Sequence, residues 1–321
     1  MKKFLVIQTA FIGDVILGTA VVEKLHQFYP HAQIDYLVRK GNETLLVDHP
    51  ILKNVLVWQK KENKYKNLFK LAKQIRETKY DFVINLQRHA GSGFLTWRSR
   101  TNQKIGFESN PLSFFYTQKF PHQIGNGMHE VERNQQLISN LTDEIFAQPK
   151  LYPSPQNYLN IDNLNLDKNY IVIAPASVWF TKQLPKQKVI ELINKQDENL
   201  QICLIGAPSD AEYCQTILDA SNHKNTINLC GKLNLLDSAA LIQNAKMNFV
   251  NDSAPLHIAS AMNANVTVFF CSTIPKFGFG PLSKTAIIKE VAKKLDCRPC
   301  GIHGHKQCPK GHFKCGLEIE L

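Results

Sequence analysis

Residues 2–30 read KKFLVIQTAFIGDVILGTAVVEKLHQFYP. The apolar run at residues 4–8 has the length of a short strand, and the turn after it contains Gly13 and Asp14. An amphipathic run then extends over residues 15–29, and a proline ends it. The stretch therefore predicts a strand, a turn and a long helix, in that order.

The alternation of strand and helix continues along the chain. We predict further strands at residues 33–38, 54–58, 81–86, 170–174, 201–205, 226–229, 247–250 and 266–271. We predict further helices at residues 68–78, 131–141, 186–194, 210–220, 235–244 and 255–262, with a loop over residues 110–128. Strands separated by helices pair in parallel through right-handed crossovers, so the predicted fold class is α/β, with two doubly wound units in tandem.

The length of 321 residues and the 44% of hydrophobic residues are sufficient for two folded cores. Residues 148–168 contain three prolines and many Asn and Asp residues, a composition typical of a linker. We therefore predict an N-terminal domain at 1–150, a linker at 151–168, a second domain at 169–290 and a Cys/His-rich tail at 291–321. Ligands of open α/β sheets bind beyond the carboxyl ends of the strands, so residues that follow strands are the candidates for function.

The chain is basic, with 38 Lys and Arg against 27 Asp and Glu. Most of the excess lies in residues 1–150, which contain 21 basic and 13 acidic residues. Such a charge favours an anionic partner, for example a nucleotide, a nucleic acid or an anionic glycolipid. No apolar run approaches the roughly 18 residues that a membrane span needs. We therefore expect a cytoplasmic protein.

Two segments that follow predicted strands carry groups suited to substrate binding. In the first, Gly13 lets a ligand approach closely, and Asp14 is either a helix cap or a general base. In the second, the hydroxyl groups of Ser177 and Thr181 and the charge of Lys182 could bind phosphate oxygens. The alternative for the second segment is an ordinary polar loop.

A third segment, residues 251–257, reads NDSAPLH and follows another predicted strand. Its acid or serine would cap a helix, and its proline suits the first helical turn. The free N–H groups of a helix start also form an anion site, and His257 would lie beside the same ligand. A histidine at such a position can equally serve only to pack against its neighbours.

These segments and the C-terminal cysteines resemble the ADP-heptose:lipopolysaccharide heptosyltransferase family (glycosyltransferase family 9). The most specific pieces are GDV at 13–15, HEVERN at 129–134, NDSAPLH at 251–257 and KFGFGP at 276–281. The resemblance covers nearly the whole chain. It implies a GT-B fold, in which two Rossmann-like domains face each other across a central cleft. It also implies an inverting transfer, with no metal, of a heptose or related sugar from an ADP-sugar to a lipopolysaccharide core or lipid A-type acceptor.

The resemblance assigns roles to individual residues. Asp14 matches the general base, and Lys182 is expected to stabilise the charge of the leaving ADP. The N-terminal domain would bind the acceptor and the C-terminal domain the nucleotide-sugar. The expected donor-binding residues are Gly13, Ser177, Lys182, Asp210, Leu233, Asp252, Ser253, Ala254 and His257. In the basic first domain, the expected acceptor-binding residues are Arg88, His89, His129 and Arg133.

Four cysteines, Cys297, Cys300, Cys308 and Cys315, lie in the last 25 residues together with three histidines. One CxxC pair with two further cysteines could form a structural zinc site. The alternative is a set of reduced, packed thiols, and a disulfide is disfavoured in a cytosolic protein. Catalysis itself is expected to need no cofactor.

The expected partners are an ADP-sugar donor and a phosphorylated glycolipid acceptor, with peripheral, electrostatic contact at the cytoplasmic face of the inner membrane. One alternative is a glycosyltransferase that uses another nucleotide-sugar for cell-envelope glycan synthesis. A second alternative, from a different class, is a basic, non-catalytic nucleic-acid-binding protein. The irregular cysteine spacing and the lack of a recognition helix argue against that class, so no nucleic-acid partner is expected.

Overall fold

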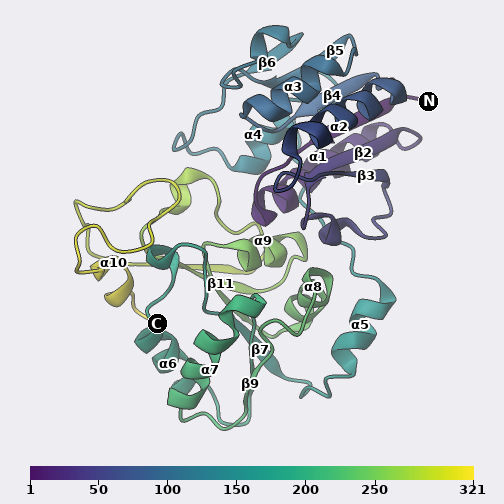
Figure 1. The fold of residues 1–321 in the computed structure, drawn as a ribbon. Coiled ribbons are helices and arrows are strands. Elements are labelled where there is room, and N and C mark those ends of the chain that lie inside the picture. Colours follow the sequence, from purple (N-terminus) through teal and green to yellow (C-terminus); the bar gives the residue numbers. More distant parts are fainter. The chain divides into compact units, whose positions relative to one another are not determined.

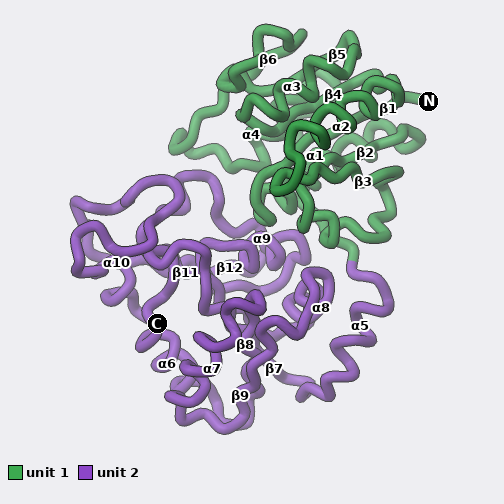
Figure 2. Tube along the Cα trace, in the orientation of Figure 1, with its two compact units in different colours: residues 1–152 green, residues 153–321 purple.

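The computed structural model describes residues 1–321, which divide into two compact units, Met1–Tyr152 (unit 1) and Pro153–Leu321 (unit 2) (Figure 2). Each unit contains one six-stranded sheet in which every strand pair is parallel, with helices packed against it (Figure 1). The fold is therefore α/β, with two Rossmann-like units in tandem, which is the GT-B type. No helix combines the length and the apolar composition of a membrane span.

The sheet of unit 1 has the strand order β3–β2–β1–β4–β5–β6. Its central strand is the one predicted from the first apolar run, and residues 4–7 are fully buried because helices cover both faces. The strands are β1 Lys3–Ile7, β2 Gln33–Arg39, β3 Leu52–Trp58, β4 Phe82–Asn85, β5 Gln103–Phe107 and β6 Gln118–Phe120.

The four helices of unit 1 are α1 Ile12–Phe28, α2 Lys64–Thr78, α3 Ala90–Arg98 and α4 Glu130–Gln136. Helices α1 and α4 contact each other, and α2 and α3 contact each other. Tyr36 lies beside Val6 in the sheet and donates a hydrogen bond to the carbonyl of Val15 in α1 at 3.0 Å. Leu5 and Ile7 point to the other face, where they join the core formed with α2 and α3.

The sheet of unit 2 has the strand order β12–β11–β10–β7–β8–β9. Its strands are β7 Tyr170–Ala174, β8 Gln201–Leu204, β9 Thr226–Asn228, β10 Asn248–Asn251, β11 Val266–Phe270 and β12 Ala286–Glu290. Its helices are α5 Pro155–Asp162, α6 Lys186–Asn194, α7 Ala211–Ala220, α8 Leu235–Asn244, α9 Ala254–Ala261 and α10 Lys314–Leu317. The predicted strands and helices of this half coincide with these elements to within one or two residues.

The sequence-based prediction missed α3 and the strands β5, β6 and β12. Helix α3 contains two glycines, which lower helix propensity, but tertiary packing requires them. A Cβ on Gly91 would lie 2.4 Å from the Trp58 ring, and one on Gly93 would lie 2.3 Å from Asn110. Strand β6, in the segment predicted as loop, has only three residues at the sheet edge.

The segment predicted as a linker contains helix α5, which packs against α8. Pro155 occupies the first turn of α5, where a proline is well tolerated. Asn157 and Asn160 both donate to the Asp237 carboxylate, at 2.8 and 3.1 Å. The asparagines that suggested a flexible linker therefore attach this helix to unit 2.

The C-terminal tail also folds onto unit 2. The side chains of Val291, Phe313, Cys315 and Ile319 are buried in the hydrophobic core that contains Ile173. The tail is therefore an integral part of this unit rather than a separate appendage.

Candidate active site

Asp14 lies in the first turn of α1, just beyond the carboxyl end of β1. Its Oδ2 accepts a hydrogen bond from the backbone N–H of Phe11 at 3.1 Å. The carboxylate therefore has the capping role that was one of the two alternatives predicted for it. A carboxylate has acceptor sites on both oxygens, so this bond leaves it able to accept a proton.

The surroundings of Asp14 change its acidity. Burial and the negative charge of Glu130 raise the pKa of Asp14 to about 6, while the Phe11 N–H and the Arg88 guanidinium act in the opposite direction. Arg88 follows β4 and Glu130 begins α4, so separate elements place both charges near Asp14. A carboxyl with a pKa just below neutral is well suited to taking up a proton during a reaction.

Glu130 is held by a buried network that the sequence did not reveal as part of a site. Its Oε2 accepts a hydrogen bond from Arg133 Nε at 2.8 Å and lies 3.2 Å from His122 Nε2. Burial opposes ionisation, but these two partners lower the pKa of Glu130. Glu130 therefore stays charged and contributes to the raised pKa of Asp14. Its position within the HEVERN motif was the signal that could have identified it.

The four residues predicted to bind an acceptor fall into two groups. Arg88 and His89 are exposed and follow β4, at the same edge of the sheet as Asp14. His129 caps α4, and its Nδ1 accepts from the N–H of Val131 at 3.2 Å. Arg133 is only 1% exposed and is paired with Glu130. Of the second pair, Arg133 is therefore buried beneath the surface, whereas His129 is half-buried.

In unit 2, Lys182 and Asp252 form an ion pair with Nζ and Oδ2 2.6 Å apart. The hydroxyl of Thr273 donates to the same oxygen at 2.7 Å, and the three side chains are largely buried. They follow β7, β10 and β11, which are neighbours in the sheet. The sequence predicted Lys182 and Asp252 for this site but missed Thr273.

The side chain of Asn251 holds the loops around this ion pair in place through three hydrogen bonds. Its Nδ2 donates to the carbonyls of Ala174 and Pro175 at 3.2 and 2.9 Å, and its Oδ1 accepts from the N–H of Leu184 at 2.9 Å. The backbone N–H of Ser177 donates to the Gln183 side chain at 3.1 Å. The loop that carries Ser177 and Lys182 is therefore held at both of its ends.

Ser253 precedes α9, which begins at Ala254, and its side chain makes no capping bond to the helix. Pro255 has no N–H and the N–H of Leu256 donates to the Ser253 carbonyl at 3.1 Å, so among the first three residues of α9 only Ala254 retains an N–H for an anion. His257, one turn further on, is buried, and its ring centroid lies 6.5 Å from that of Phe279.

The remaining predicted donor-binding residues are Gly13, in the first turn of α1 in unit 1, and Asp210 and Leu233, which follow the adjacent strands β8 and β9 of unit 2. Asp210 accepts a hydrogen bond from the N–H of Ala207 at 2.8 Å, and Leu233 is partly exposed. Gly231 has a φ of +74°, and a Cβ on it would lie 2.8 Å from Pro208. This close approach brings the two strand-end loops together.

Comparison with known proteins identifies the family, because residues 68–312 match the model of glycosyltransferase family 9 (heptosyltransferase). The chain belongs to this family. Lipopolysaccharide heptosyltransferase 3 of Escherichia coli is 26% identical to it over 277 residues, which are 82% of each chain. The E. coli ADP-heptose lipopolysaccharide heptosyltransferase II has the same fold, with a TM-score of 0.79, 22% identity and coverage of 94% of this chain and 96% of that one. E. coli heptosyltransferase WaaC, solved with ADP, has a TM-score of 0.72 and 21% identity, over 89% and 92% of the two chains.

The tail of this glycosyltransferase reaches the edge of the sheet that carries Lys182. Arg298 donates to the carbonyls of Cys271 and Thr273 at 2.6 and 2.7 Å and pairs with Glu290 at 2.5 Å. The N–H of His305 donates to Thr181 Oγ1 at 2.8 Å, and the N–H of Thr181 donates to the carbonyl of His305 at 3.1 Å. The tail therefore braces the loop that carries Lys182.

The predicted structural zinc site is not supported, because no group of three or more His, Cys, Asp or Glu side chains is arranged to hold a metal. Cys315 is 3% exposed and packs in the apolar core. The thiol of Cys300 donates to the carbonyl of Cys297 at 2.9 Å. All eight cysteines are free thiols, which agrees with the alternative of reduced, packed side chains.

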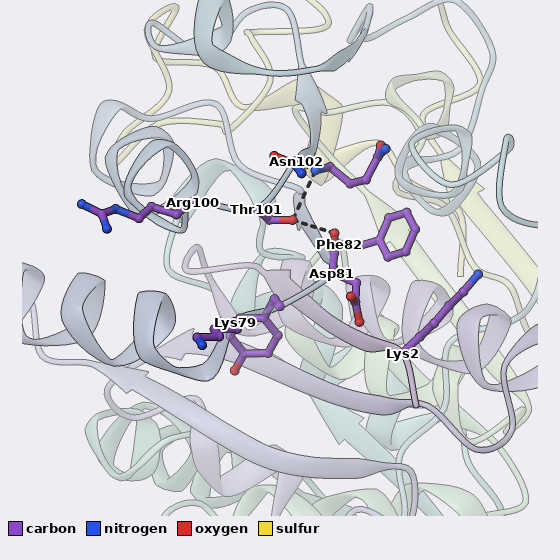
Figure 3. Close-up of a pocket in the computed structure, with 9 residues that line it drawn as sticks. Lys2, Lys79, Asp81, Phe82, Arg100, Thr101 and Asn102 are labelled. Carbon is purple, nitrogen blue, oxygen red and sulfur yellow. Dashed lines mark hydrogen bonds between the residues drawn. The ribbon is translucent and has the colours of Figure 1, made fainter.

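A pocket of about 470 Å³ lies at the opposite edge of the unit 1 sheet, near the amino ends of β1, β4 and β5 (Figure 3). Its lining includes three basic residues, Lys2, Lys79 and Arg100. Lys79 and Arg100 extend to one side and Lys2 extends to the other (Figure 3). Because these charges diverge, they do not converge on one point in the pocket.

Proposed function

We propose that this glycosyltransferase transfers a heptose from an ADP-sugar to a hydroxyl of a lipopolysaccharide core or lipid A-type acceptor, with inversion at the anomeric carbon. The observation that carries the proposal is Asp14, a carboxylate with a pKa of about 6 at the carboxyl edge of the unit 1 sheet. The sugar and the acceptor are inferred from the relatives, whose names describe lipopolysaccharide heptosyltransferases.

In the proposed reaction, an acceptor hydroxyl attacks the anomeric carbon from the face opposite the diphosphate. Asp14 takes the hydroxyl proton as the new C–O bond forms, and the bond between the sugar and ADP breaks with its electron pair passing to the diphosphate. A general base of this kind contributes about 10²–10⁴-fold to the rate. The pKa leaves most of the Asp14 population ionised at pH 7, as a base requires.

We assign donor binding to unit 2. Lys182 supplies the positive charge that a diphosphate needs and the Ala254 N–H at the start of α9 supplies a donor, while Asp252 with Thr273 fixes the position of the Lys182 ammonium group. We assign Asp210 and Leu233, which follow β8 and β9, to binding of the nucleoside. Because the protein itself supplies this charge, we propose that transfer needs no divalent cation, which turnover in the presence of EDTA would test.

We assign acceptor binding to unit 1. Arg88 and His89 are exposed at the edge of the sheet that carries Asp14, so they are the proposed contacts for acceptor phosphates. His129 and Arg133 are assigned a supporting role, because they hold the start of α4 and the charge of Glu130.

The test of this function is Asp14→Asn, with Asp48→Asn, an exposed position in the same unit, as the control. We expect Asp14→Asn to lose at least about 100-fold in kcat while calorimetric ADP affinity stays unchanged.

The raised pKa means that the charged Asp14 opposes folding above its unfolded pKa of 3.8, by at most about 3 kcal/mol at neutral pH. The neutral amide should therefore melt no lower than the wild type. Near-normal turnover in a folded Asp14→Asn protein would exclude the proposed base.

A further inference from the structure

A row of five aromatic rings runs across unit 1, from α2 over α3 to the short 3₁₀ helix η2, Ser113–Phe115. Neighbouring ring centroids are 5.4, 5.9, 4.8 and 4.2 Å apart. We name the row, in this order, the aromatic row: Phe69, Phe94, Trp97, Phe115 and Phe114. These residues are up to 46 positions apart in the sequence, so the fold, rather than local sequence, assembles the row.

The aromatic row is unusually exposed for apolar side chains. Phe69 is 61% exposed, Phe114 is 66% exposed and Trp97 is 37% exposed. Contiguous apolar surface of this kind on a soluble unit marks a contact with another surface. The rings already pack edge to face, stacked or tilted against one another, so they form a preformed patch rather than isolated side chains.

Basic residues surround the row. Helix α2 contains five Lys and Arg residues and one Glu. Residues 90–104 contain three Lys and Arg residues and no Asp or Glu. On the exposed side of α2, the helical spacing places Lys66, Lys70 and Lys73 along the side that carries Phe69. Arg98 lies over the Trp97 ring, with 5.4 Å from its Cζ to the ring centroid. The patch therefore combines apolar rings with positive charge.

We propose that the face of unit 1 formed by α2, α3 and η2 binds the anionic surface of a lipid bilayer. Aromatic side chains favour the headgroup region of a membrane, and lysines and arginines beside them add attraction to acidic lipids. A second copy of this chain fits the face poorly, because a symmetric contact would bring two basic helices together. The inference rests on the proposed function in one respect: the proposed acceptor is anchored in a lipid surface of this kind.

The experiment is flotation of the full chain with vesicles of mixed phosphatidylglycerol and phosphatidylcholine, compared with phosphatidylcholine alone. Lys66→Glu/Lys70→Glu/Lys73→Glu is expected to reduce partitioning onto the anionic vesicles by at least about 30-fold. Phe69→Ser/Phe114→Ser is expected to reduce it by about 10-fold, because less apolar surface is buried. The matched controls are Lys246→Glu/Lys293→Glu/Lys294→Glu for charge and Ile145→Ser/Phe146→Ser for exposed apolar side chains, and each should change partitioning by less than about 3-fold.

Thermal melting of each variant ensures that only folded proteins are compared. Equal loss of binding in the test and control variants would overturn the proposal, because it would show that net charge rather than this face decides the contact. Dimers of the wild type that dissociate in the aromatic variant would also overturn it, in favour of a second copy. Vesicle binding needs no sugar donor, so this result is independent of the proposed transfer reaction. Turnover of a deacylated, water-soluble acceptor by the lysine variant should remain normal.

Discussion

At the scale of single residues, the proposed role of Asp14 as general base predicts how activity depends on pH. The ionised carboxylate is the active form of a base, so kcat/KM should rise with pH through a midpoint near 6 and level off above pH 7. Glu130→Gln removes a charge that raises the pKa of Asp14, so it favours the ionised form of Asp14. The rising limb measured with Glu130→Gln should therefore move to lower pH, while exposed Glu144→Gln should leave it in place.

Lys182 supports a second prediction at this scale. Lys182→Ala removes the cation paired with Asp252 and leaves that buried carboxylate with the Thr273 hydroxyl as its recorded partner. We expect the Kd for ADP, measured by calorimetry, to rise by about 10–100-fold, since charged hydrogen bonds to phosphate contribute about 1.5–3 kcal/mol. Exposed Lys195→Ala serves as the control. An unchanged Kd would remove Lys182 from the proposed phosphate site.

At the scale of elements, the tail and the loop that carries Lys182 depend on each other. Arg298 connects the tail to the end of β11, and the backbone around His305 pairs with Thr181 next to Lys182. Arg298→Ala should destabilise unit 2 by about 3 kcal/mol and weaken ADP binding, because several buried carbonyl groups and Glu290 lose their donor. Exposed Lys310→Ala, in the same tail, should do neither. Denaturant unfolding and calorimetry would measure both effects, and wild-type ADP affinity in a destabilised Arg298→Ala protein would show that the tail has only a structural role.

The elements also show which features the sequence predicts and which it does not. Strand β1 and helix α1 were predictable because each is a mainly apolar run and Pro30 follows the helix, although α1 is buried on all sides from Val15 to Leu25 rather than amphipathic. Helix α3 was not predictable, because its glycines lower helix propensity. Gly91 and Gly93 are required by close contacts with Trp58 and Asn110, which are distant in the sequence. Local motifs predict Asp14, Lys182 and Asp252 as site residues. Thr273 contacts Asp252, and Arg298 of the tail contacts the Thr273 carbonyl. These contacts join segments that are distant in the sequence, so no local sequence pattern predicts them.

At the scale of the whole molecule, the uneven charge allows a test of the proposal that unit 1 binds the acceptor and unit 2 the donor. Unit 1 contains 21 basic and 13 acidic residues, whereas unit 2 contains 17 and 14. A phosphorylated acceptor that binds unit 1 would be attracted by exposed charges such as Arg88. Salt weakens this attraction, because the Debye screening length is about 10 Å at 0.1 M ionic strength. The diphosphate of the donor would meet Lys182, whose side chain is 14% exposed and therefore less screened.

Raising the salt concentration should therefore increase the KM for the acceptor several-fold more than the KM for the ADP-sugar. Steady-state kinetics with a deacylated acceptor would measure both constants without a membrane, and equal salt dependence of the two would contradict the assignment of the acceptor to unit 1.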